Sequence, residues 1–222
     1  MSFDLGYMLT VLPKLLNYVY LTLGLTILSY ALGCLFGLTT AIATTYRTTV
    51  LDRLARLYIS FFRGTPLLVQ LFIIYFGLPQ LFPAFGSLTA YWAAVIGISL
   101  NSGAYLSETF RAAILSVDRG QWDALHSIGM NGWQGWRRIV LPQAARIAVP
   151  SMGNVWISVL KETSLAFTLG LGEVLGQAKI LAGSSFRFFE CYLAVALIYW
   201  AITILFGTLQ HRVEKAMNVP YR

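Results

Sequence analysis

The polar side chains that could do chemistry in this 222-residue chain lie within long apolar runs. Asn101, Tyr105 and Glu108 follow i, i+4, i+7 spacing, which places them on one face of a helix. A carboxylate at membrane depth is costly and usually faces a cavity or a partner, so this face is a candidate site for a polar solute. Arg111, one helical turn further on, could instead neutralise Glu108.

A second polar group lies in a later apolar run. Asn154, Ser158 and Lys161 share one predicted helical face, and Glu162 lies beside them. If this helix faces the first, the two together offer a cation, carboxylates and amides to a small charged molecule. The alternative is a local one, in which Lys161 extends toward the membrane surface and pairs with Glu162. The sequence leaves both interpretations open.

Enzymatic, metal and nucleotide chemistry are not indicated. The sequence has no HExxH motif and no Ser–His arrangement typical of a hydrolase. His126 and His211 have no second His or Cys at ligand spacing, and Cys34 and Cys191 lie in separate apolar runs. A phosphate-binding G-x-x-x-x-G-K-[S/T] loop is also absent. We therefore expect no enzyme, no metal site and no cofactor bound by this chain.

The composition indicates that membrane-spanning helices position these residues. The chain is 57% hydrophobic and 11% charged, with a mean hydropathy of +0.67, which would expose too much apolar surface in a water-soluble domain. The charge-free stretch between Lys14 and Arg47 exceeds the roughly 20 residues that a spanning helix needs, and Gly and Pro divide the stretch between Arg63 and Glu108 in two. We predict one all-α, polytopic domain over 1–222, with its core at 15–211. Its five spans are predicted near 15–46, 57–80, 88–113, 145–169 and 190–211.

The basic residues predict the orientation of these spans. Twelve of the sixteen Lys and Arg fall on one side of the predicted membrane, which is the cytoplasmic side by the positive-inside rule. The N-terminus is then outside and the C-terminus is in the cytoplasm. This asymmetry also accounts for the net charge of +7, so we expect no nucleic-acid partner.

The segment DALHSIGMNGWQGWRRIVLPQA, residues 123–144, differs from the spans in having three Gly, two Trp and an Arg pair. It predicts a first short helix that stops at Asn131-Gly132 and a second that runs to Pro142. Gly129 would allow another surface to approach this helical hairpin closely. An interfacial amphipathic loop, with Trp at the headgroups and Arg on anionic lipid, is the alternative. Spacing alone does not separate the two.

Asp123-Ala124-Leu125, Gly129 and Ile139-x-Leu141-Pro142 match, at every fixed gap, the EAA loop of ABC-transporter permease subunits. The departures are Asp123 for the usual Glu and Leu125 for the usual Ala. The likeness extends over most of the chain, which resembles the polar amino-acid permeases of bacterial ABC importers and is most similar to cystine permeases. The segments that carry it are FRGTPLLVQLF (62–72), SLNSGAYLSETFRAAI (99–114), GQWDALHSIGM (120–130), RRIVLPQA (137–144) and KETSL (161–165).

This resemblance implies a type I (MetI-like) permease fold in the bacterial inner membrane. It also implies a second permease chain, identical or paralogous, two cytoplasmic ATPase subunits that carry ATP and Mg²⁺, and an extracytoplasmic substrate-binding protein. The expected substrate is a polar amino acid, with L-cystine as the finer assignment. The candidate substrate-binding residues are Asn101, Tyr105, Glu108, Ser158, Lys161 and Glu162.

The resemblance assigns the hairpin, at 117–144, to coupling with the ATPase. Residues 127–134 would form the helix that enters a groove of the ATPase, and Asp123 would pair with Arg137 or Arg138. The expected coupling residues are Asp123, Ala124, Ser127, Ile128, Gly129, Met130, Asn131, Arg137 and Arg138. The competing hypothesis is an ion-coupled carrier or channel with Glu108 and the Lys161/Glu162 pair as its relay. It is less favoured because no repeated halves are evident and an autonomous carrier has no role for the hairpin.

Overall fold

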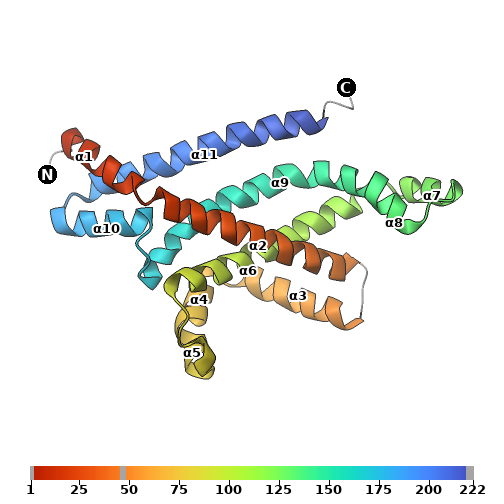
Figure 1. Cartoon of the computed structure of the whole chain (residues 1–222), viewed down its shortest axis with the longest axis horizontal. Helices are drawn as coiled ribbons and strands as arrows, with labels where there is room; N and C mark the ends of the chain where they lie inside the picture. The colour runs from red at the N-terminus through yellow and green to blue at the C-terminus, as the bar shows by residue number, and fades with distance from the viewer. Residues whose placement is uncertain (1–2, 46–48, 219–222) are drawn as a thin grey trace.

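The computed structural model describes residues 3–45 and 49–218, and every regular element within these ranges is a helix. The long helices lie side by side along the longest axis of the molecule (Figure 1), with one short arm projecting sideways and another pair of short helices at one end. The predicted all-α fold is confirmed. The boundaries of several predicted spans differ from those in the structure, and each difference has a local cause.

The first predicted span is two helices, α1 (Leu5–Leu16) and α2 (Val19–Thr45). Asp4 begins α1, where its side chain accepts a hydrogen bond from the Tyr7 N–H at 2.9 Å. α1 then packs on the two last helices, α10 (Val174–Ser185) and α11 (Phe188–Asn218), through its buried residues Met8, Val11 and Leu15. The break at residues 17–18 lets α1 follow this surface while α2 takes a separate course, so the predicted start near residue 15 is wrong.

The central helix is α6 (Ala90–Leu115), which matches the third predicted span to within two residues at each end. It packs against α2 along small side chains. A Cβ built on Gly37 of α2 would lie 2.7 Å from the Leu106 Cβ and 3.0 Å from the Gly103 carbonyl oxygen of α6. A Cβ built on Gly33 would likewise collide with the Ser102 side chain. These two glycines therefore serve packing inside the chain, because only the absent side chain permits this approach.

The second predicted span, 57–80, is not one helix. α3 (Thr49–Gly64) is followed after Pro66 by α4 (Leu67–Phe72), and the two directions differ by 110°. Pro66 has no N–H and disfavours helical backbone at Thr65, so the first helix ends there. The chain continues through a π-turn at Ile73–Gly77, α5 (Leu78–Leu81) and a 3₁₀ turn at Pro83–Phe85, which form the projecting arm in Figure 1.

The fourth predicted span starts earlier than predicted, at Gly132, and ends at Leu169 as predicted. α7 (Arg119–Ser127) precedes a turn, after which α8 (Gly132–Gly135), a π-turn at Trp136–Val140, α9 (Leu141–Glu162) and a 3₁₀ segment at Thr163–Leu169 run on without a break. The predicted stop at Pro142 is wrong, because Pro142 lies in the first turn of α9, directly after a π-turn. At Gly170, which has a φ of +87°, the chain turns toward α10, between the fourth and fifth predicted spans.

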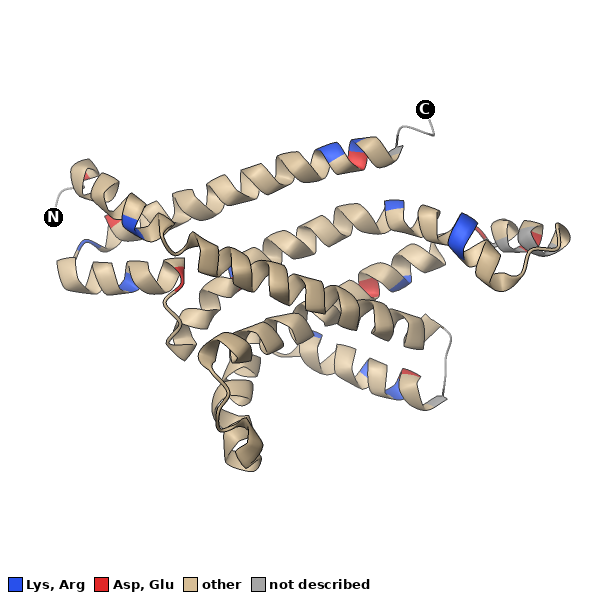
Figure 2. Cartoon of the chain, viewed as in Figure 1, with Lys and Arg blue, Asp and Glu red and all other residues tan. Residues whose placement is uncertain are grey.

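By length and composition, α2 and α11 can each cross a membrane, and so can the bent pairs Val50–Gly64 with Leu67–Leu81 and Gly132–Leu169 with Val174–Ser185. α6 has 26 residues and so a length of about 39 Å, but it is not among the described helices that are both long and apolar enough to cross. α11 extends the fifth predicted span to residue 218. Figure 2 shows that the middle turns of α2 and α11 carry no charged residue.

Replacing Gly37 with Leu tests the α2–α6 contact. The added side chain would collide with the α6 backbone, and overpacking of this kind costs about 1–3 kcal/mol. We expect that loss in the free energy of unfolding, measured in micelles by denaturant titration. Gly207→Leu on α11 is the matched control, since a Cβ there has no neighbour within 4 Å. Equal stability of the two variants would contradict the packing role.

Candidate functional site

A polar cavity of about 340 Å³ lies between α6 and α9. Three lining residues of α9, Asn154, Ser158 and Glu162, are spaced at i, i+4 and i+8, so they share one helical face. Four of the six predicted substrate residues meet here. The full lining is Asn101, Ser102, Tyr105, Asn154, Val155, Ser158, Val159 and Glu162.

Asn101 has a structural task as well as a place in the cavity. Its side-chain Nδ2 donates to the Phe62 carbonyl oxygen at 3.1 Å and to Gln70 Oε1 at 3.0 Å. Gln70 Nε2 in turn donates to the carbonyl oxygens of Phe62 and Thr65, both at 3.0 Å. These bonds satisfy backbone oxygens left free where α3 ends. Both amide hydrogens of Asn101 are thus committed, and its remaining polar function toward the cavity is an acceptor, Oδ1.

Glu108 and Lys161 lie outside the cavity. Glu108 forms an ion pair with Arg111 at 2.7 Å, which is the neutralising arrangement described above as the alternative. Lys161 instead lines a separate small cavity beside Tyr199. The predicted face had Lys161 aligned with Ser158 and placed Glu162 at its edge, whereas the helical repeat of α9 turns Glu162 toward the cavity. In the described part of the chain, no ion pair joins Lys161 to Glu162.

The sequence reasoning missed a cation beside the cavity. The Arg63 guanidinium carbon lies 5.5 Å from the centre of the Tyr105 ring, and Tyr105 lines the cavity. Arg63 is the last basic residue of α3, next to the 110° break that Pro66 introduces. Only the fold of α3 onto α6 brings this charge near Tyr105. The cavity itself combines a carboxylate with amide and hydroxyl acceptors, and the Arg63 guanidinium lies against the Tyr105 ring.

The segment between α7 and α8 is a turn and not a helix. Gly129 has a φ of +72°, a conformation that favours glycine, and Asn131 starts α8 as its N-cap. The Asn131 side chain accepts from the Gln134 N–H at 2.9 Å, and the Asn131 N–H donates to Gln134 Oε1 at 3.2 Å. The prediction of one contacting helix over 127–134 is therefore wrong. Ile128 and Trp133 are each 70% exposed on either side of this turn.

The other predicted coupling residues surround the turn. Ala124, Ser127 and Arg137 are exposed, whereas Met130 is half-buried. Asp123 does not pair with Arg137 or Arg138 in the described part of the chain, so that prediction is also wrong. The turn and the Asn131 cap connect α7 to α8. The side chains of Asp123, Arg137 and Arg138 are exposed.

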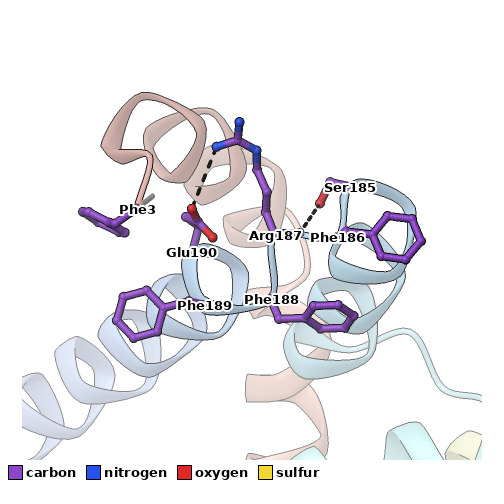
Figure 3. Close-up of a pocket in the computed structure, with 7 residues that line it drawn as sticks. All are labelled: Phe3, Ser185, Phe186, Arg187, Phe188, Phe189 and Glu190. Atoms are coloured by element: carbon purple, nitrogen blue, oxygen red, sulfur yellow. Dashed lines mark hydrogen bonds and ion pairs between the residues drawn. The ribbon is translucent and has the colours of Figure 1, made fainter. Parts of the chain in front are cut away.

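A second cavity, of about 600 Å³, lies where the turn between α10 and α11 meets residues before α1 (Figure 3). Arg187 pairs with Asp4 at 2.5 Å and lies 3.8 Å from Glu190, toward which Figure 3 shows it directed. The Tyr7 N–H, and then Arg187, hold the pKa of Asp4 below its usual value. These charges satisfy one another and tie α1 to α11. The surrounding rings of Phe3, Phe186, Phe188 and Phe189 are exposed.

Long apolar helices, a polar cavity between two of them and an exposed helical turn at one end define a multi-pass transport protein. Residues 33–219 match the family described as "Binding-protein-dependent transport system inner membrane component". The chain belongs to this family, as a permease subunit of an amino-acid ABC importer.

Individual relatives agree over nearly the whole length. The chain is 50% identical over 221 residues to the "Probable amino-acid permease protein YxeN" of Bacillus subtilis, covering 100% of this chain and 99% of the relative. It is 42% identical to the "L-cystine transport system permease protein TcyL" of the same organism, covering 98% and 92%. A solved structure described as "an amino acid ABC transporter with histidines" matches with a TM-score of 0.88 and 36% identity, over 97% of this chain and 100% of that one.

The Asn131 cap can be tested by substitution. Asn131→Ala removes the acceptor for the Gln134 N–H, at a cost of about 1 kcal/mol. The backbone amides of Gln134 and Gly135 should then exchange hydrogen roughly fivefold faster, as followed by mass spectrometry. Asn131→Ser keeps a side-chain oxygen and should exchange at close to the wild-type rate. Identical exchange in the Ala and Ser variants would argue against the cap.

Proposed function

We propose that this subunit passes a polar amino acid across the membrane through the α6–α9 cavity, with L-cystine as the finer assignment. The observation that carries the proposal is the meeting of Glu162, Asn101 and Ser158 in one cavity between α6 and α9. Similarity to a relative named as an L-cystine permease supports the choice of substrate.

An amino acid has an ammonium group and a carboxylate, and the site offers complementary groups for each. Glu162 and the free Oδ1 of Asn101 are acceptors for the ammonium group. Arg63, above the Tyr105 ring, is the nearby cation for the carboxylate. The ion-coupled carrier is disfavoured because Glu108, its proposed relay, is already paired with Arg111.

Glu162→Gln and Lys161→Met test whether the amino acid binds in the cavity, because Glu162 lines it and Lys161 does not. A charge-assisted hydrogen bond contributes roughly 1.5–3 kcal/mol, so Glu162→Gln should weaken amino-acid binding about ten- to a hundredfold. Lys161→Met should leave binding nearly unchanged, because Lys161 does not line the cavity. Binding is measured by calorimetry on the purified importer without its binding protein. A larger loss of binding in Lys161→Met than in Glu162→Gln would reject the cavity as the binding site.

The proposed partners are a second permease chain, two cytoplasmic ATPase subunits that bind ATP and Mg²⁺, and an extracytoplasmic binding protein. The Lys and Arg asymmetry supports an orientation with the N-terminus outside and the α7–α8 end in the cytoplasm. The turn at 128–131 is then the surface that enters the ATPase. Its exposed Ile128 and the open space around Gly129 support this role.

Ile128→Ser tests the docking surface. Removing a buried apolar side chain from an interface costs about 1.5–3 kcal/mol, so retention of the ATPase during purification and the uptake rate should both fall at least about tenfold. The permease itself should remain folded, because Ile128 makes little contact within the chain. Gln121→Ala, on the exposed surface of α7, is the control. Wild-type ATPase retention and uptake in Ile128→Ser would exclude the turn as the coupling surface.

A further inference from the structure

Glu173 is a carboxylate with no exposed surface, buried between α2, α10 and α11. Among the described residues it forms no ion pair. Its oxygens instead accept three hydrogen bonds, from the Gly176 N–H at 2.9 Å, the Tyr199 hydroxyl at 3.0 Å and the Thr22 hydroxyl at 3.2 Å. A buried carboxylate satisfied only by neutral donors is costly to maintain, so its position has a specific structural consequence.

That consequence is to hold α2, which is distant in sequence, against the consecutive helices α10 and α11. Thr22 belongs to α2 and Tyr199 to α11, while Glu173 is the N-cap of α10. Glu173 follows closely on the turn at Gly170, whose φ is +87°. The hydrogen bonds therefore fix the direction in which the chain leaves the 3₁₀ segment Thr163–Leu169, and with it the end of α9.

A polar connection runs from Glu173 back to the amino-acid cavity. Tyr199, whose hydroxyl donates to Glu173, also lines a small cavity with Lys161 and Ser164, the residues on either side of Glu162 and Thr163. Thr163 is buried and its hydroxyl donates to the Leu160 carbonyl oxygen at 2.7 Å, in the last turn of α9. Thr163 directly follows Glu162, which lines the cavity. The connection thus ends one residue from the carboxylate proposed to bind the ammonium group.

We propose that Glu173 is a positioning residue for amino-acid binding: through Tyr199 it holds the end of α9 so that Glu162 stays directed into the cavity. This inference rests on the proposed function of the cavity. Glu173 does not touch the substrate in this role. The competing account is that Glu173 is only a structural cap. Its loss would then lower the stability of the complex, and binding would weaken only as far as stability falls.

Tyr199→Phe breaks the connection while leaving the bond between Glu173 and Gly176. We expect binding of the free amino acid to the purified importer, without its binding protein, to weaken about three- to tenfold. The midpoint of thermal unfolding should fall less than in Glu173→Ala, because Glu173 keeps its bonds to Gly176 and Thr22. Tyr192→Phe, on the exposed side of the same helix, is the matched control and should bind as the wild type does.

Substitutions at Glu173 provide the rescue test. Glu173→Gln keeps an oxygen for the Gly176 N–H and gains an amide that can donate to the hydroxyl oxygens, so binding should stay near the wild-type value. Glu173→Ala loses all of these bonds and should bind at least as weakly as Tyr199→Phe. The inference is overturned if Tyr199→Phe binds normally, or if its loss of binding is matched by a loss of thermal stability.

Glu162→Gln, measured alongside, keeps the two proposals distinguishable. Weaker binding in Glu162→Gln with normal binding in Tyr199→Phe would reject the positioning role alone. Normal binding in Glu162→Gln would reject the cavity itself as the amino-acid site, and the positioning role with it.

Discussion

The need to satisfy backbone polar groups inside the membrane governs this structure. Hydrocarbon offers no hydrogen bonds, so a helix that breaks at membrane depth must find partners within the protein. The break between α3 and α4 meets this need through Gln70 and Asn101, whose side-chain nitrogens reach the carbonyl oxygens of Phe62 and Thr65. The same arrangement joins α3, α4 and α6, and it leaves the Asn101 oxygen available at the cavity.

The proposed binding and coupling surfaces are connected by one nearly continuous helix. From Gly132 to Leu169 the chain runs through α8, a π-turn, α9 and a 3₁₀ segment, with the exposed turn at its start and Glu162 near its end. This run contains a π-turn at Trp136–Val140 and an internal proline, Pro150, both of which are common bending points of helices. It nevertheless joins the exposed turn to the cavity within one stretch of chain.

Neutral donors around Glu173 and ion pairs around Arg187 stabilise the opposite end of the molecule. Both clusters link helices from the two ends of the sequence: Thr22 with Glu173, and Asp4 with Arg187. They compensate for the small apolar contact that α11 makes elsewhere, since much of its surface, including Trp200 and Leu205, is exposed. That exposed apolar surface is suited to lipid contact.

The sequence by itself determined the class of fold, the approximate spans and the polar residues of α6 and α9, because hydropathy and helical spacing depend only on local order. It also marked the segment proposed to couple to the ATPase, through the Gly129 and Ile139-x-Leu141-Pro142 pattern. Tertiary structure alone decided that Arg63 lies beside Tyr105, that Arg111 neutralises Glu108, and that Glu162, and not Lys161, faces the cavity. The physical reason is that these outcomes depend on how helices rotate and bend against one another. Packing of small residues such as Gly37 and hydrogen bonds between distant segments, such as Thr22 with Glu173, set that arrangement.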